Sequence, residues 1–243
     1  MYFQPKRLKM TLKKLKTNKL FYGEWPYKIS TVCVGATLLR ARGIQYLKKW
    51  CITPNINRHW SKRKNIDPLL LLDYLIKLEH YIALGIKLRI EHDQISIFLK
   101  DVALYQEMVT ELSDYVISVT EPADAAELEI IESDSKIVLC NHLPKHMYRY
   151  KVVFKDMDID TASNMLEWAE KYDENCIGIP NATRKNFSGK RGFWPNACYF
   201  YARDRSMVMM ITMAAGGNIR RVEEFVPRYS INKVADQEPI CQH

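Results

Sequence analysis

The chain has 243 residues, of which 47% are apolar, and it contains only nine glycines and ten prolines. This composition excludes collagen-like and disordered proteins, and the length allows one large domain or two small ones. A net charge of +8 at pH 7 favours an anionic partner such as nucleic acid.

The six cysteines show no CxxC spacing, and Cys33, Cys176 and Cys198 fall inside apolar stretches typical of strands. This pattern is typical of reduced thiols in a cytoplasmic protein and not of a disulfide framework. The apolar residues 69–72 belong to a helix that charges interrupt, so no membrane contact is expected. The basic N-terminus lacks the apolar stretch of a signal peptide.

Residues 1–24 are predicted to form a flexible basic arm. Residues 6–19 contain seven lysines or arginines and no acid, a charge density that keeps a segment mobile until it meets an anion. Leu8, Leu12 and Leu15 would form an apolar stripe if the arm became helical.

The first folded unit is predicted over residues 25–122, with a helical and basic insertion over residues 36–65. Its expected elements are a strand over residues 27–34, a helix over 36–50, a basic segment over 58–64, a helix from Asp67, a hairpin over 86–100, a helix from Asp101 and a strand over 116–120.

An acidic linker is predicted over residues 123–146, in which residues 128–131 and 136–140 can pair as short strands. The second unit follows over residues 147–230, and a tail over residues 231–243. Its expected elements are a strand over residues 148–155, a helix capped by Asp160, a strand over 176–180, a loop over 181–196, a strand over 197–202, a helix from Asp204 to the Gly216-Gly217 stop, and a strand over 219–226.

The order β-α-β-β-α-β is that of the ferredoxin-like arrangement. The first unit repeats it, since Tyr27-Lys28 corresponds to Tyr150-Lys151 and Asp101 to Asp204. The sequence therefore predicts an α+β protein with an internal duplication: two tandem ferredoxin-like units, the first carrying the insertion.

Strand periodicity separates two faces of residues 197–202. Cys198, Phe200 and Ala202 point one way, while Tyr199 and Tyr201 point the other. Two phenol rings beside basic residues are typical of surfaces that stack bases and neutralise phosphates. The matching positions of the first unit include Ser96 and Phe98 and hold no tyrosine pair. The second unit is therefore the predicted binder and the first the predicted scaffold. The alternative for the tyrosines is that they pack under another layer of the protein.

Residues 150–227, with the basic loop Lys190-Arg191-Gly192-Phe193 before an aromatic strand, resemble the RNA-recognition motif family in fold and surface type. The resemblance implies that Phe193, Tyr199 and Tyr201 stack bases. The candidate nucleic-acid-binding residues are Arg184, Lys185, Lys190, Arg191, Phe193, Tyr199, Tyr201, Lys13, Lys14, Lys62 and Arg63.

Other motifs give weaker support for a functional site. Asp156, Asp158 and Asp160 form a D-x-D-x-D pattern that could hold metal ions, but the neighbouring loop is basic, and a helix cap at Asp160 is favoured. Residues 140–146 contain one cysteine and two histidines without a second ligand pair. Four methionines over residues 207–213 are expected to fill the core. Neither a catalytic residue nor a metal or cofactor is predicted.

The sequence thus favours a non-catalytic protein that binds RNA or single-stranded DNA. One alternative is a structural or assembly protein of viral type, which self-associates, contacts nucleic acid through its basic arm and resides in the virion. A second is an RNA-processing or metal-dependent nuclease or nucleotidyl transferase.

Overall fold

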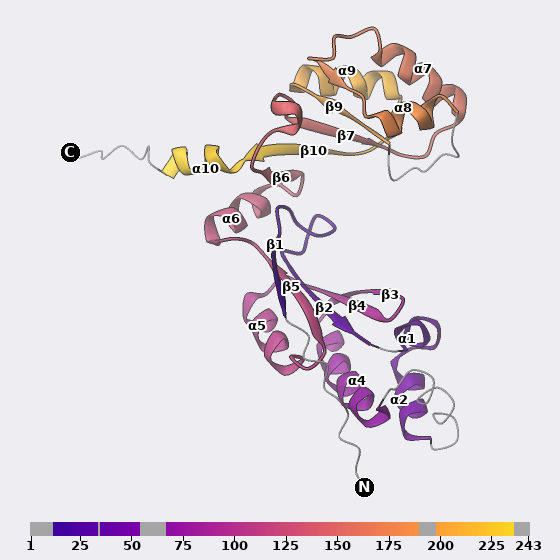
Figure 1. Cartoon of the computed structure of the whole chain (residues 1–243), viewed down its shortest axis with the longest axis vertical. Helices are drawn as coiled ribbons and strands as arrows, with labels where there is room; N and C mark the ends of the chain where they lie inside the picture. The colour runs from indigo at the N-terminus through magenta and orange to yellow at the C-terminus, as the bar shows by residue number, and fades with distance from the viewer. Residues whose placement is uncertain (1–11, 34, 54–66, 190–197, 236–243) are drawn as a thin grey trace, which may run out of the picture. The chain divides into compact units, whose positions relative to one another are not determined.

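The computed structural model describes residues 12–33, 35–53, 67–189 and 198–235. The protein is an α+β protein with two mixed five-stranded sheets (Figure 1). The chain divides into two compact units, residues 1–128 and 129–243. Each unit has a sheet and a hydrophobic core of its own.

The first unit contains a sheet of strand order β1-β5-β2-β4-β3. β1 pairs with β5 in parallel, and the other neighbouring strands are antiparallel. The strands are β1 (Lys13–Lys16), β2 (Tyr27–Val32), β3 (Lys87–Glu91), β4 (Gln94–Leu99) and β5 (Val116–Glu121). Its helices are α1 (Ala36–Arg42), α2 (Ile44–Ile52), α4 (Pro68–Ala83) and α5 (Val102–Glu111), and α6 (Ala125–Ser133) spans the division between the units.

In the first unit two helix signals act as the sequence predicts, and one glycine divides a helix that was expected to be continuous. The carboxylate of Asp67 accepts a hydrogen bond from the Leu69 amide, with Pro68 in the first turn of α4. Asp101 caps α5 in the same way. Gly43 divides the helix expected over residues 36–50, because it takes φ 81° and ψ 168° between α1 and α2, a conformation open to glycine but not to other residues.

The second unit has the sheet order β6-β10-β7-β9-β8, with β6 and β10 parallel and the other neighbours antiparallel. The strands are β6 (Ile137–Cys140), β7 (Tyr150–Phe154), β8 (Ile177–Gly178), β9 (Tyr199–Ala202) and β10 (Ile219–Pro227). The helices are α7 (Ile159–Ala169), α8 (Asn181–Phe187), α9 (Arg205–Ala215) and α10 (Arg228–Ala235), with a short 3-10 turn, η1 (Pro144–His146), before β7.

The two units repeat one plan. In each, an extra first strand (β1 or β6) runs parallel to the last strand (β5 or β10), and the four remaining strands lie in the order last, first, third, second. The cross-strand registers also agree: Lys28 lies opposite Phe98, and Lys151 opposite Tyr201. Asp204 caps α9 two residues after its strand, as Asp101 does in the first unit. The correspondence predicted between the units therefore extends to strand order and register.

Four further local expectations differ from the structure. Residues 13–16 of the predicted arm form strand β1. Residues 128–131 lie in α6 and not in a strand, because the Asp124 carboxylate accepts a hydrogen bond from the Glu127 amide and starts a helix there. The cap of α7 is Asp158, which accepts from the Thr161 amide, and Asp160 lies in the first turn. The loop expected over residues 181–196 begins with helix α8.

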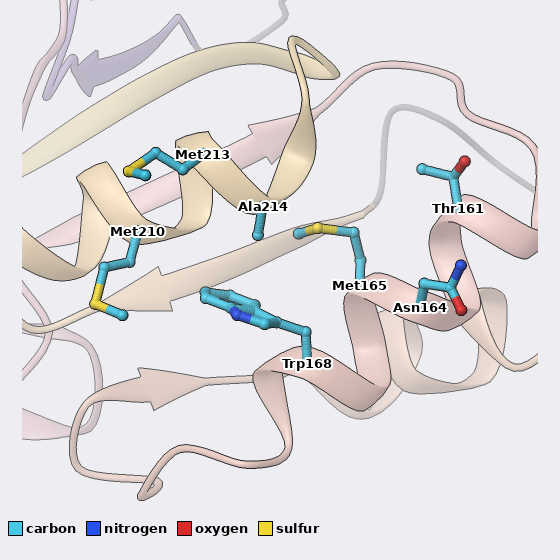
Figure 2. Close-up of a pocket in the computed structure, with 7 residues that line it drawn as sticks. All are labelled: Thr161, Asn164, Met165, Trp168, Met210, Met213 and Ala214. Carbon is cyan, nitrogen blue, oxygen red and sulfur yellow. The ribbon is translucent and has the colours of Figure 1, made fainter.

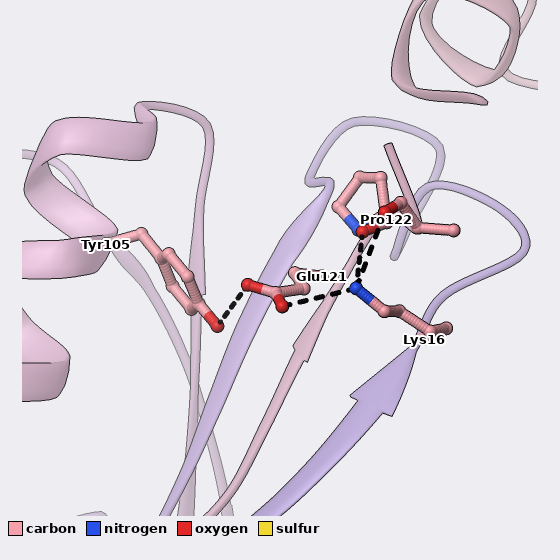
Figure 3. A network of polar contacts seen from close by, with 5 residues as sticks. Lys16, Tyr105, Glu121 and Pro122 are labelled. Atoms are coloured by element: carbon pink, nitrogen blue, oxygen red, sulfur yellow. Dashed lines mark hydrogen bonds and ion pairs between the residues drawn. The ribbon is translucent and has the colours of Figure 1, made fainter. Parts of the chain in front are cut away.

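A polar network joins β1 to the end of β5 (Figure 3). Lys16 Nζ donates to Glu121 Oε1 at 3.3 Å and to the carbonyl of Pro122 at 3.3 Å. The Tyr105 hydroxyl of α5 donates to Glu121 Oε2 at 3.2 Å. Burial and the neighbouring Glu121 carboxylate raise the pKa of Tyr105, which keeps its phenol protonated as the donor.

The cysteines of the described ranges form no disulfide; Cys33, Cys51 and Cys198 are buried, and Cys140 and Cys176 are half-buried. Burial raises the pKa of Cys51 to about 11, so this thiol is protonated at neutral pH. Among the described residues, no helix has the length and apolar character needed to cross a membrane.

Candidate nucleic-acid interface

Strand β9 has one face in the core and one outside it. Cys198, Phe200 and Ala202 are fully buried against α7, α8 and α9, while Tyr199 and Tyr201 are half-buried on the other side of the sheet. We call this second side the outer face of the unit. The alternation read from the sequence is what positions the two tyrosines there.

An aromatic cluster covers part of this outer face. The ring of Tyr148, which precedes β7, stacks on Tyr201 with a centroid distance of 5.5 Å and an interplanar angle of 11°. Tyr199 meets Tyr201 edge-on at 5.2 Å, and Phe225 of β10 lies 6.1 Å from Tyr201. Tyr148 is only 1% exposed, and its hydroxyl donates to the backbone carbonyl of Glu174. Tyr201 is therefore already stacked within the protein, and Tyr199 is the tyrosine of the predicted pair without such a stacked neighbour.

Charges on the outer face lie beside Tyr199. Lys151 Nζ lies 4.3 Å from the centroid of the Tyr199 ring, within the range of a cation–π contact. Glu223 is nearly buried and lies 3.6 Å from Lys151 and 3.0 Å from Arg221, so it balances part of the positive charge. Burial and the adjacent Tyr199 hydroxyl raise the pKa of Tyr201 to about 12, so its phenol is neutral at physiological pH.

The structure does not bring Arg184 and Lys185 to the tyrosine pair. Both lie on α8, whose Phe187 packs with Phe154 and Phe200 on the helix-covered side of the sheet. Arg184 is paired with Glu170 at the end of α7, and Lys185 is exposed. The other predicted residues of this surface, Lys190, Arg191 and Phe193, lie outside the described residues.

Of the first-unit candidates, Lys13 and Lys14 are exposed on the edge strand β1, beside Ser118 and Val119 of β5. Lys62 and Arg63 lie outside the described residues. Lys13 is thus available for electrostatic contact, without a defined pocket around it.

The outer face of the first unit was missed by sequence reasoning. Phe98 of β4 is 3% exposed, because the connection between β1 and β2 lies against it. The rings of Phe21 and Tyr22 from this connection lie 5.4 and 5.0 Å from the Phe98 ring. Lys28 Nζ lies 5.9 Å from the Phe21 ring, and Lys87 Nζ lies 4.2 Å from the Tyr22 ring. The correspondence of Phe98 with Tyr201 was the signal that could have found this surface.

A hollow of about 350 Å³ opens on the same face. We call it the first-unit groove. It is lined by Thr17, Asn18, Lys19, Leu20, Phe21, Tyr22, Lys28, Arg89, Glu91, Ser96 and Phe98.

The two units also differ in charge. Residues 1–128 contain 20 lysines and arginines against 13 aspartates and glutamates, whereas residues 129–243 contain 16 against 15. The excess positive charge of the protein therefore belongs to the first unit.

Comparison of the chain with protein-family models, curated proteins and solved structures finds no match. The assignment of a function consequently depends on the surfaces themselves.

One carboxylate of the D-x-D-x-D pattern serves as a helix cap. Asp158 accepts hydrogen bonds from both the amide and the hydroxyl of Thr161, and the amide bond in particular lowers its pKa. The rings of His142 and His146 lie 5.8 Å apart. The described residues contain no group of three histidine, cysteine, aspartate or glutamate side chains placed to hold a metal ion.

A hollow of the second unit lies on its helical side, between α7 and α9 (Figure 2). It has a volume of about 540 Å³ and is lined by Met165 and Trp168 of α7 and by Met210, Met213 and Ala214 of α9. Met213 is 80% exposed and Met209 is 67% exposed. The expectation that the methionines of this helix fill the core is therefore wrong for these two, which lie on the surface.

Proposed function

We propose that the protein binds single-stranded nucleic acid, RNA or DNA, without catalysing a reaction on it. The observation that carries the proposal is a lysine beside an aromatic ring on the outer face of each sheet: Lys28 Nζ lies 5.9 Å from the Phe21 ring, and Lys151 Nζ lies 4.3 Å from the Tyr199 ring. A cation beside an aromatic ring is the combination that binds a phosphate and stacks a base.

The arrangement of the strands supports the same proposal. We propose that both units are ferredoxin-like, since each contains four strands in the order last, first, third, second, with helices against one face. The resemblance of the second unit to the RNA-recognition motif assigns the base contacts to the face on which Tyr199 lies. On this face Tyr199 stacks a base, and Lys151 and Arg221 neutralise the adjacent phosphates.

Binding of a fluorescent single-stranded oligonucleotide tests this function. In Tyr199→Ala the affinity is expected to fall about fivefold or more, because stacking on one aromatic ring contributes about 1–3 kcal/mol. Tyr229→Ala is the matched control, because Tyr229 is an exposed tyrosine on α10 of the same unit. The affinity of the wild type should also fall steeply with salt. Equal binding by the two variants, or no binding at low salt, would contradict the proposal.

A second candidate function is self-association, and the methionine surface of α9 favours it. Exposed methionines at a groove between two helices are suited to an apolar protein partner. If this surface joins copies of the chain, light scattering should show an oligomer that Met213→Glu converts to a monomer. Val102→Glu, an equally apolar exposed position on α5, serves as the control. A monomeric wild type at micromolar concentration would exclude this candidate.

A further inference from the structure

A serine lines the first-unit groove at the position where the second unit has a tyrosine. Register identifies the pair: Ser96 lies two residues before Phe98 on β4, and Tyr199 lies two residues before Tyr201 on β9. In the second unit the Tyr199 ring occupies this position, beside Lys151. In the first unit the small Ser96 side chain leaves the space open, and the groove follows.

Aromatic rings form the apolar part of the groove. Phe98 lies at the sheet, and Phe21 and Tyr22 pack against it at ring distances of 5.4 and 5.0 Å. Their contacts with each other hold the rings in place before any ligand binds. A preformed aromatic wall binds a planar ring at a low cost in conformational entropy.

Cations form the polar part. Lys19, Lys28 and Arg89 line the groove, and Glu91 is its only acid among the lining residues. Arg89 lies opposite Ser96 on β3 and is fixed by an ion pair with Glu91. The Tyr22 hydroxyl and Glu91 raise the pKa of Arg89 further, so its charge is permanent. The lining therefore carries two positive charges in excess.

We propose that the first-unit groove binds one nucleoside phosphate, with the base against the aromatic wall and the phosphate between Lys28 and Arg89. The volume of about 350 Å³ is that of a small-molecule site and admits one nucleotide. The inference deepens the proposed function, because the same chemistry occurs in a free nucleotide and in a nucleotide of a single strand. It also assigns binding to the unit that the sequence predicted to be a scaffold.

Filling the groove tests the proposal. In Ser96→Tyr the new ring should occupy the groove as Tyr199 does in the second unit, with Lys28 placed like Lys151. Calorimetric titration with adenosine monophosphate should show binding to the full-length wild type, and a loss of about tenfold or more in the variant. Circular dichroism should be unchanged, since the other unit accommodates a tyrosine at the same position. Binding of the nucleotide that is unaffected by Ser96→Tyr overturns the proposal, as does the absence of binding at millimolar nucleotide.

Charge substitutions test the site independently of the fold of Ser96→Tyr. Lys28→Gln and Arg89→Gln should each weaken binding of adenosine monophosphate several-fold and leave binding of adenosine, which lacks the phosphate, almost unchanged. Lys77→Gln removes the same charge from α4, where Lys77 is paired with Asp73 at 2.9 Å, and should have no effect. Equal losses for the three variants would show that net charge alone acts, and would overturn the assignment.

The choice of probe distinguishes a free nucleotide from a nucleotide of a single strand as the ligand. It also tests the groove site separately from the proposed role of the second unit. If the natural ligand is a free nucleotide, Ser96→Tyr weakens binding of adenosine monophosphate and leaves binding of a single-stranded oligonucleotide unchanged. If it is a nucleotide of a strand, the variant weakens both. An effect of Tyr199→Ala on oligonucleotide binding without one of Ser96→Tyr on either probe contradicts the groove site alone. The opposite result contradicts the proposed role of the second unit alone.

Discussion

Gly178 shows how one missing side chain shapes the outer face of the second unit. A Cβ atom at this position would lie 2.6 Å from Cζ of the Tyr148 ring. Glycine thus allows Tyr148 to lie flat over β8 and to stack on Tyr201. Gly178→Ala is expected to reduce the free energy of unfolding by about 1–3 kcal/mol, the usual cost of overpacking a filled site. Urea unfolding followed by fluorescence measures it.

Tyr148, whose ring lies against Gly178, supplies the control for Gly178→Ala. If the ring is the cause, the glycine substitution should cost much less in a Tyr148→Ala background, because the clashing atoms are gone. A double-mutant cycle gives this coupling directly. Equal costs in both backgrounds would place the strain in the backbone of β8 instead.

Asp204 makes the stability of the second unit dependent on acidic pH. Its carboxylate accepts a hydrogen bond from the Met207 amide, and this bond lowers its pKa below the ordinary value of 3.8. A lowered pKa in the folded state adds stability above the pKa of the unfolded state, and this contribution is lost as the pH falls through the folded value. Asp204→Asn keeps a capping oxygen and should flatten this part of the profile below about pH 4. Urea midpoints measured from neutral to acidic pH test this, and an unchanged profile contradicts it.

At the scale of elements, β1 depends on a few contacts at one end. Lys16 bonds Glu121 and the carbonyl of Pro122, and the Thr17 amide donates to the Glu121 carbonyl at 2.8 Å. Because the Lys16 side chain is half exposed, its pair contributes at most about 1 kcal/mol to global stability. Lys16→Met should therefore open the strand locally.

Amide hydrogen exchange followed by NMR detects such a local opening. The Thr17 amide is expected to exchange faster in Lys16→Met, with the amides of β2 and β4 unchanged. Lys14→Met is the matched control, since Lys14 is exposed on the same strand and is not among the residues of the network in Figure 3. Faster exchange in both variants would mean that charge and not the network holds β1.

Much of the element order could be predicted from local signals. Asp67, Asp101 and Asp204 start helices because each carboxylate can bond amides two or three residues later, which requires no tertiary information. The two faces of β9 follow from alternation alone. The choice of Asp158 over Asp160 could not be read in this way, since both are acids followed by suitable amides and the entry of the chain from β7 decides between them.

The contacts made by the segments that connect the strands could not be predicted from sequence patterns. Phe21 and Tyr22 lie on Phe98, and Tyr148 lies on Tyr201, yet these three covering rings lie outside the strands, where no alternation points to their partners. Strand β1 was missed because four exposed residues with three lysines have neither alternation nor β-branched side chains. The groove at Ser96 could not be predicted for the same reason. It depends on the absence from β4 of a ring like that of Tyr199 and on the position of the connection between β1 and β2 over the sheet.

At the scale of the whole molecule, separate cores predict separable units. Residues 1–123 and 135–243 are each expected to fold when expressed alone, with the dispersed amide NMR spectrum of a packed domain. The first piece has 20 basic and 11 acidic residues, and the second has 16 and 12. The first piece should therefore show the steeper fall of oligonucleotide affinity with salt. Equal slopes would mean that the excess charge of the first unit does not contact the strand.

The contact between Tyr148 and Tyr201 has a consequence for the rate of binding. A second base, beyond the one on Tyr199, can stack on Tyr201 only after the Tyr148 ring has left it, whereas the groove beside Ser96 is open before the ligand arrives. Stopped-flow mixing with an excess of oligonucleotide should thus give a fast phase that accelerates with concentration and a slow phase that reaches a ceiling. The limiting rate of the slow phase would equal the rate constant with which the Tyr148 ring leaves Tyr201. The substitution Tyr148→Ala should remove this limit.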